Sequence, residues 1–349
     1  MRIIEIIKNI KEFFRRFLNP IRIFTLLIIC LFVILAGFLI YLMTGKAVPA
    51  EKIEFGVTFS RPFAQKLSLN WKDAYLAILN DLGVRKLRLV AYWSEIESNK
   101  DNYVFDPLDW QIQEAKKVGA EVILAFGMKA PRWPECHIPL WAFNSSKLEQ
   151  QKELLDFIRI VVDRYKDEKT IKYWQVENEP FLRGFGECPK LDEEFLDKEI
   201  ALVKELDSRP VILTTSGELS LWSEPAKKTN ILGTTLYRVI YNEYFGVIHY
   251  PIPSVFYHKR AELIKRFFGV EKVFIIELQA EPWWPKQIYE TELDKQFKSM
   301  NFKEFQNIIE YSRQTGFDEV YLWGVEWWYW LKTLQDDTYF WAEARKLWQ

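Results

Sequence analysis

Two glutamates that follow β-rich runs have the residue type and spacing for acid–base chemistry on one substrate. Glu179 lies in the stretch 173–180, which reads YWQVENEP, and Glu277 ends the run 273–277, which reads VFIIE. Pro180 cannot continue a central strand and biases the preceding residue toward extended geometry, so the sequence predicts Glu179 at the C-terminal tip of a strand. Cleavage of a glycosidic bond requires one protonated carboxyl group and one ionised carboxylate. The pair therefore indicates sugar-cleaving chemistry, with Glu179 as the proton donor.

Each of these glutamates has a competing interpretation. Glu177 shares the strand parity of Glu179, and the alternative role for Glu177 is an ion pair inside the barrel. Pro180 favours Glu179 as the acid. Taken alone, Glu277 is more typical of a strand-end charge paired with a neighbouring Lys or Arg, and its spacing from Asn178-Glu179 is what favours the catalytic interpretation.

Short β-rich runs alternate with longer helical patterns from residue 53 onward. Apolar residues recur at three and four positions in the helical patterns, and Gly83, Gly119 and Gly316 end three of the helices. The expected strands are 53–59, 86–91, 121–126, 171–176, 211–215, 231–237, 273–277 and 319–323. The expected helices are 71–82, 109–118, 148–165, 191–206, 257–268 and 302–315.

Eight strand–helix repeats in just under 300 residues predict a (β/α)8 barrel. A doubly wound open sheet is the alternative, and it is disfavoured because no glycine-rich phosphate loop follows the first strand. Glu179 follows the fourth expected strand and Glu277 ends the seventh, 98 residues later. Strands four and seven lie nearly opposite each other in such a barrel, so both carboxylates are expected to face one sugar at its mouth.

Composition excludes several functional classes. The chain has 349 residues, 49% of them hydrophobic and 27% charged, with a net charge of −1, which is typical of a globular enzyme and not of a nucleic-acid-binding protein. The three histidines, His137, His249 and His258, lack metal-ligand spacing, so neither a metal nor a cofactor is expected. His137 is expected to be an exposed loop residue or a substrate contact. No Gly-x-Ser-x-Gly elbow for a serine hydrolase is present.

The N-terminal region predicts a membrane anchor. The run 23–43 carries no charge and, at about 1.5 Å per residue, is long enough to cross the roughly 30 Å hydrocarbon layer. Basic residues before this run place the N-terminus in the cytoplasm and the remainder outside the cell. A cleaved signal peptide is the alternative. We therefore expect a basic amphipathic cytoplasmic leader (1–22), a transmembrane helix (23–43), a tether (44–51) and an exported barrel domain (52–349), with the lipid bilayer as a partner.

Cys136 and Cys188 are the two cysteines of the part expected to be exported. Both lie in expected loops that follow neighbouring strands at the same face of the barrel. An exported pair can form a disulfide, and two unpaired thiols are the alternative.

The motif Asn178-Glu179-Pro180 resembles the strand-four motif of the clan A retaining glycoside hydrolases, which include cellulase-like and β-galactosidase-like families. The stretches 92–97 and 103–109 are similar to the region after strand two in several of these families. The resemblance covers roughly residues 55 to 347. It implies that Glu179 is the acid/base, that Asn178 binds the sugar 2-hydroxyl and that Glu277 is the nucleophile. Leu278-Gln279 departs from the usual continuation after the nucleophile.

The same resemblance implies roles for three further residues. Arg88 matches an Arg near the nucleophile, where a cation favours the ionised carboxylate. Tyr237 matches a Tyr that hydrogen-bonds the nucleophile, and Trp323 matches the aromatic floor beneath the cleaved sugar. A structural ion pair and an ordinary strand aromatic are the alternatives for Arg88 and Tyr237. Apolar sugar faces stack on aromatic rings, so two or three further tryptophans are expected to line the cleft from the set Trp93, Trp133, Trp283, Trp284, Trp327 and Trp328, and Trp93, Trp133 and Trp283 are the predicted substrate contacts.

These features predict a membrane-anchored, exported enzyme that cleaves oligo- or polysaccharides by retaining double displacement, with the two carboxyl groups about 5 to 5.5 Å apart. A transglycosylase that uses the same residues is one alternative. A non-catalytic glycan-binding barrel on the cell surface is the other.

Overall fold

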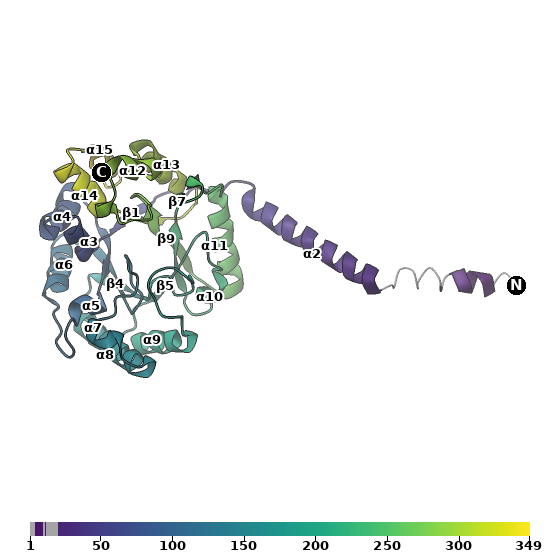
Figure 1. Cartoon of the computed structure of the whole chain (residues 1–349), viewed down its shortest axis with the longest axis horizontal. Helices are drawn as coiled ribbons and strands as arrows, with labels where there is room; N and C mark the ends of the chain where they lie inside the picture. Colours follow the sequence, from purple (N-terminus) through teal and green to yellow (C-terminus); the bar gives the residue numbers. More distant parts are fainter. Residues whose placement is uncertain (1–3, 10, 12–19) are drawn as a thin grey trace. The chain divides into compact units, whose positions relative to one another are not determined.

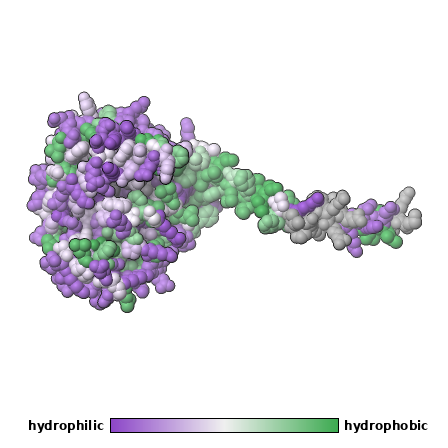
Figure 2. All heavy atoms as spheres, viewed as in Figure 1, coloured by the Kyte–Doolittle hydropathy of each residue, from purple (hydrophilic) through white to green (hydrophobic). Residues whose placement is uncertain are grey.

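The computed structural model describes residues 4–9, 11 and 20–349. The described chain divides into two units, Met1–Lys46 and Ala47–Gln349. In the first, helix α2 (Pro20–Met43) contains the span Arg22–Met43, which is long and apolar enough to cross a membrane or to serve as a signal sequence. Its surface is almost entirely hydrophobic (Figure 2). The expected amphipathic leader falls largely outside the described residues.

The second unit is a closed barrel of eight parallel strands surrounded by helices (Figure 1). The strand order is β1-β10-β9-β6-β5-β4-β3-β2, and pairing of β1 with β2 closes the barrel. The (β/α)8 prediction is confirmed. The barrel strands are β1 (Glu54–Thr58), β2 (Lys86–Val90), β3 (Glu121–Phe126), β4 (Ile171–Val176), β5 (Val211–Thr215), β6 (Ile231–Leu236), β9 (Lys272–Gln279) and β10 (Glu319–Trp323).

The helices of this unit lie between the strands and at the chain's end. They are α3 (Arg61–Lys66), α4 (Trp71–Ala77), α5 (Trp93–Ile96), α6 (Asp106–Lys117), α7 (Leu140–Phe143), α8 (Lys147–Tyr165), α9 (Glu193–Leu206), α10 (Ser223–Ala226), α11 (Ser254–Phe268), α12 (Leu293–Ser299), α13 (Phe302–Arg313), α14 (Val325–Leu334) and α15 (Tyr339–Arg345). A π-helical turn, η1 (Ile78–Leu82), continues α4, and η2 (Ile288–Glu290) is a 3-10 turn.

Local sequence signals explain where these helices begin and end. Helix α8 starts with a capping box in which Ser146 and Glu149 satisfy each other's backbone N–H groups. Gly83 and Gly269 end their helices at positive φ, where a residue with a side chain would be strained. The six expected helices are all present, with end shifts of a few residues.

Two hydrophobic layers hold the barrel together. Buried apolar side chains between strands and helices form the larger one. The smaller one fills the barrel interior and consists of Ile123, Ile212, Ile231, Phe274, Ile276 and Tyr321. At the N-terminal end of the strands, Lys86 pairs with Glu54, Glu121 and Glu319. In barrels of this kind, residues at the N-terminal end of the strands contribute to stability, whereas catalytic residues lie at the C-terminal end.

An antiparallel hairpin, β7 (Val239–Asn242) with β8 (Gly246–His249), is inserted after β6. The sequence pattern did not predict it. Gln279 at the end of β9 fastens its start, because the Gln279 amide accepts from the backbone N–H groups of Arg238 and Val239 and donates to the Val239 carbonyl.

Candidate active site

A cavity of about 540 Å³ opens at the C-terminal ends of the strands. All eight strands, or the loops that follow them, contribute to its lining. Glu179 and Glu277 both face it, as do Asn178, Tyr237 and Trp323. The site that the sequence predicts at the mouth of the barrel is therefore one continuous cavity.

Glu277 reaches the cavity from a bulge in β9. On the β6 side, Thr234 pairs with Ile275 and the next residue, Thr235, pairs with Glu277. One residue of β9 is therefore skipped in the pairing. The register to β10 shifts at the same place. A bulge re-aims the side chain at which it occurs. The strand also continues two residues past Glu277 to Gln279, so the expectation that the strand ends on this carboxylate is wrong.

Both carboxylate oxygens of Glu277 accept hydrogen bonds. The Arg88 guanidinium donates to Oε1 at 2.6 Å, and the Tyr237 hydroxyl donates to Oε2 at 3.1 Å. Arg88 is fully buried and also donates to Gln175 at 2.8 Å and to Asn178 at 2.7 Å. The contacts expected of Arg88 and Tyr237 are thus present, and they stabilise an ionised carboxylate at a fixed orientation.

Glu179 does not lie in extended geometry at a strand tip, as the sequence predicted. Strand β4 ends at Val176, and Glu177 and Glu179 both have positive φ, at 57° and 42°. The left-handed backbone persists because its polar groups are bound: the Glu179 N–H donates to Thr214 Oγ1 at 2.7 Å, and Lys129 Nζ donates to the Glu179 carbonyl at 3.1 Å. Such backbone strain is typical of functional sites.

The environment of Glu179 favours its protonated form. Burial raises the pKa of the carboxyl group well above its ordinary value, and repulsion from Glu277 and Glu135 raises it further. Thr235 Oγ1 is the hydrogen-bonding group at Oε1, at 3.4 Å. Glu179 is therefore suited to donate a proton near neutral pH.

The competitor Glu177 is turned away from the cavity. Its two carboxylate oxygens accept the backbone N–H groups of Met128 and Lys129, each at 2.7 Å. These bonds fasten the chain after β3 to the chain after β4. Glu177 is therefore a structural residue, although its partners are backbone amides and not the ion pair considered from the sequence.

The expected aromatic residues divide into two groups. Trp133, Trp283, Trp284 and Trp323 line the cavity. Trp93, Trp327 and Trp328 are fully buried outside its lining, so the expectation that Trp93 binds substrate is wrong. The Trp93 indole donates to Glu97 at 2.8 Å and packs edge-on against Trp141, which makes it a core residue.

Several cavity residues were missed by the sequence reasoning. Arg132 lies between the rings of Phe63 and Trp323 and pairs with Glu281, whose Oε1 also accepts the Trp323 indole N–H at 2.8 Å. Glu281 and Glu218 follow β9 and β5, so a search for carboxylates shortly after every strand could have found them. Nothing in the pattern of the long loop after β3 marks Arg132.

His137 also lines the cavity, and the expectation of an exposed loop residue is wrong. Its ring packs on Tyr92 with centroids 4.4 Å apart, and Nε2 lies 3.0 Å from the Arg132 carbonyl. Burial lowers the pKa of His137 to about 4, so the imidazole is neutral. No group of three or more metal-ligating side chains is arranged for a metal ion within residues 4–9, 11 and 20–349.

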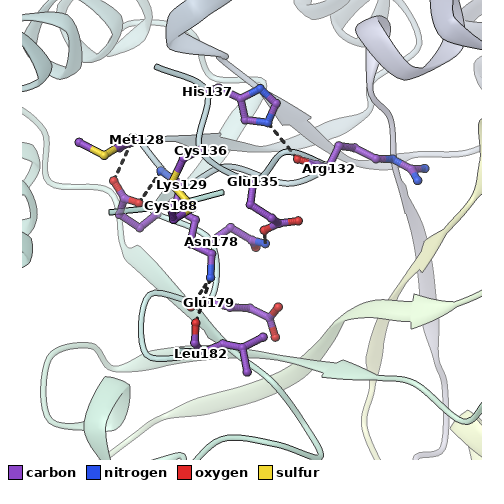
Figure 3. Close-up of a disulfide and its surroundings, with 11 residues drawn as sticks. Met128, Lys129, Arg132, Glu135, Cys136, His137, Asn178, Glu179, Leu182 and Cys188 are labelled. Atoms are coloured by element: carbon purple, nitrogen blue, oxygen red, sulfur yellow. Dashed lines mark hydrogen bonds between the residues drawn. A yellow bond between two sulfur atoms is a disulfide. The ribbon is translucent and has the colours of Figure 1, made fainter. Parts of the chain in front are cut away.

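Cys136 and Cys188 are joined by a disulfide with Cα atoms 5.2 Å apart. The bond ties the loop after β3, which carries Glu135, to the loop after β4, which carries Asn178 and Glu179 (Figure 3). Its location means that it braces the wall of the cavity.

Removing this disulfide is expected to destabilise the barrel and loosen the cavity wall. Because it closes a span of 52 residues, Cys136→Ser with Cys188→Ser should lower the free energy of unfolding by about 2 to 4 kcal/mol. Thermal melts of the full-length protein in detergent, with and without reductant, measure this. Wild-type protein should lose stability in reductant and the double variant should not change. A reductant effect of equal size in both would contradict the assignment.

Comparison with solved structures finds this barrel among enzymes that act on sugars. A GH5_18 protein from Streptomyces cattleya, solved in complex with GlcNAc, matches with a TM-score of 0.57 and 12% identity over 78% of this chain and 71% of that one. A GH5_18 protein from Bifidobacterium longum gives 0.55 and 13% over 78% and 70%. A β-galactosidase from Rahnella sp. R3 gives 0.55 and 11% over 87% and 57%.

These identities establish the shared fold. The chain spans little more than half the length of the β-galactosidases it matches, including that of Marinomonas ef1, of which it covers 54%. No protein-family model matches the sequence, and no curated protein matches it.

Proposed function

We propose that the protein is a retaining glycoside hydrolase in which Glu277 is the nucleophile and Glu179 the acid/base. The observation that carries this proposal is the contrast between the two carboxyl groups in one cavity. Glu277 is held by a buried guanidinium and a hydroxyl, whereas burial and neighbouring carboxylates keep Glu179 protonated. A protonated carboxyl group beside a second carboxylate that is bound by a cation and a hydroxyl is the pair that this chemistry requires.

The arrangement supports both halves of a double displacement. Glu277 attacks the anomeric carbon while Glu179 protonates the departing oxygen, which gives a covalent glycosyl-enzyme. Esterification removes the charge of Glu277, and with it one of the causes that raise the pKa of Glu179. Glu179, which has given its proton to the departing oxygen, therefore remains an ionised carboxylate and can take a proton from the attacking water. Hydrolysis of the ester regenerates both carboxyl groups.

Aromatic rings supply the platform on which a sugar would bind. Trp323 packs on the Arg132 guanidinium and its indole N–H is bound by Glu281, so the ring orientation is fixed. Trp283 packs against Phe185 and against Tyr237, with ring centroids 5.8 and 5.5 Å apart. Asn178 lines the same cavity and is held by a hydrogen bond from Arg88 at 2.7 Å, which supports the proposed contact to a sugar hydroxyl.

The N-terminal unit indicates where in the cell the barrel domain lies. Helix α2 supports a membrane anchor with the N-terminus in the cytoplasm and residues 52–349 outside, because basic residues precede the apolar span. The disulfide supports the same side, since disulfides persist in oxidising compartments. A cleaved signal sequence would export the same domain without an anchor.

Covalent trapping tests the proposal. Full-length protein in detergent is incubated with 5-fluoro glycosyl fluorides of several sugars, which slow the second step and keep the substituent at C2. A stoichiometric mass increase on the peptide that contains Glu277 is expected, and Glu277→Gln should take no label. Labelling of another carboxylate would overturn the assignment of the nucleophile. No labelling and no turnover by any sugar would favour a glycan-binding barrel.

A further inference from the structure

A third carboxylate, Glu135, lies beside the predicted catalytic pair. It comes from the loop after β3, is 5% exposed and lines the cavity. Its Oε2 accepts a hydrogen bond from Asn178 Nδ2 at 3.2 Å, and its side chain lies beside Asn178 and near Glu179 (Figure 3). In the proposed mechanism it only helps to raise the pKa of Glu179.

Glu135 lacks the ion pair that two other buried acids of the site possess. Glu277 is paired with Arg88, and Glu281 with Arg132. No Lys, Arg or His side chain among the described residues lies within 4.0 Å of Glu135, and Lys129 nearby donates to the carbonyls of Glu179 and Leu182 instead. Burial, with repulsion from Glu277, raises the pKa of Glu135 to about 7, although the charge of Lys129 acts in the opposite direction. A buried carboxylate with a single amide donor is costly to ionise unless a cation binds to it.

The backbone holds Glu135 in this position rigidly. Its φ is 73°, and its N–H and carbonyl are bound to Arg132 and Ala130. Gly186 packs so closely that a Cβ there would lie 2.5 Å from the Cβ of Glu135. The neighbouring Cys136 is fixed by the disulfide. A strained, over-determined position in a cavity indicates a functional constraint and not an incidental surface acid.

Six glutamates line the cavity, and three of them have no ion pair. Arg61, Arg88 and Arg132 pair with Glu95, Glu277 and Glu281. The other three, Glu135, Glu179 and Glu218, form no ion pair within the described residues. A cationic ligand would supply the charge that an ionised carboxylate among them lacks.

The contacts of Asn178 show which part of the sugar would meet Glu135. The amide oxygen of Asn178 accepts from Arg88 and Thr214, at 2.7 and 3.3 Å, so it is occupied. The amide nitrogen, which would reach the substituent at C2, is already bound to Glu135. A group at C2 therefore meets a carboxylate without a counter-ion, and a protonated amine satisfies that carboxylate by charge and by hydrogen bonding.

We propose that the cavity accepts glycosides of 2-amino-2-deoxy sugars with a free, protonated amino group, and that Glu135 is the counter-ion of that group. The inference rests on the proposed function for the placement of C2 next to Asn178.

Binding and turnover are measured on full-length protein in detergent at about pH 7. The ligands are 2-amino-2-deoxy sugars of gluco, galacto and manno configuration, with their 2-hydroxy and 2-acetamido counterparts. In calorimetry, at least one amino sugar should bind about tenfold or more tightly than both counterparts, and Glu135→Gln should abolish that preference. The ratio of kcat/KM between the matching aryl β-glycosides should change in parallel. Gln retains an acceptor for Asn178, so the variant is expected to fold.

Glu187→Gln is the matched control, because Glu187 is an exposed glutamate of the loop after β4 and does not line the cavity. It should leave the preference within about twofold, since it removes a solvated charge outside the cavity. Equal or tighter binding of the 2-hydroxy or 2-acetamido sugars by wild-type protein overturns the inference, with or without turnover. If the 2-hydroxy or 2-acetamido sugars bind as tightly and also label Glu277, the preference for an amino group is refuted and the proposed glycosidase function is retained. If no sugar labels Glu277 and none is turned over, the proposed glycosidase function itself is refuted.

Discussion

Glu277→Gln is expected to lower kcat/KM for any accepted glycoside by about 10⁴-fold or more. The amide cannot form the glycosyl ester, so the covalent route is lost and only binding and proton donation by Glu179 remain. The amide oxygen still accepts a hydrogen bond from Arg88, and the amide NH2 group donates to the Tyr237 hydroxyl oxygen instead of accepting from it, so the geometry of the cavity should persist. Steady-state kinetics and thermal melts on the same preparation measure the two effects separately.

Glu319→Gln provides the matched control for this experiment. Glu319 is also a buried strand glutamate that pairs with basic residues, Lys86 and Lys272, but it lies at the N-terminal end of β10. The control should lose stability comparably and keep its activity. If Glu277→Gln kept activity within about tenfold of wild type, Glu277 would not be the nucleophile.

The sequence was sufficient to predict the barrel because each strand is a short buried run between helices of matching periodicity. Observed ends of the strands from β1 to β10 differ from the predicted ones by a residue or two. The hairpin β7–β8 was missed since its strands are short, half-buried and paired only with each other. Hydrophobic periodicity in a sequence indicates which residues are buried against a core, and few residues of this hairpin are buried.

The details of the two glutamates depend on tertiary contacts that local sequence does not encode. The bulge that aims Glu277 arises from register to both neighbouring strands. The left-handed backbone at Glu179 is held by Thr214 and Lys129, which are distant in sequence, and those contacts override the extended preference before Pro180. The positions of the two glutamates in the barrel could be predicted from the sequence, whereas the backbone conformation at each of them could not.

Tryptophan assignments failed for a related reason. Trp93 directly follows the second strand region, as a cleft residue would, but its ring turns inward and bonds to Glu97. Side-chain direction after a strand depends on how the loop bends. The acidic character of the cavity was missed because Glu135 belongs to a long loop whose path is set by the disulfide and by Gly186.

Arg88→Met is expected to affect stability and activity together. Arg88 is fully buried and donates to Glu277, Gln175 and Asn178, so its removal leaves Glu277 as a buried charge without a counter-ion. Breaking a buried pair in this way costs about 3 to 5 kcal/mol of unfolding free energy. Activity should fall by about 10² or more because the carboxylate loses both its partner and its orientation. Arg88→Lys should recover part of the stability and less of the activity, since Lys keeps the charge but cannot form three directed bonds.

Arg132→Met is the control that separates the loss of stability from the loss of activity expected for Arg88→Met. Arg132 is also buried at this end of the barrel and also pairs with acids, Glu281 and Glu326, so its loss should destabilise the protein by a similar amount. It leaves the bond between Arg88 and Glu277 intact and loosens Trp323 instead, which should raise KM more than it lowers kcat. Urea unfolding and kinetics of both variants give the comparison. If kcat fell equally in the two variants, the loss would follow general instability of the cavity, and a specific role for Arg88 at Glu277 would be refuted.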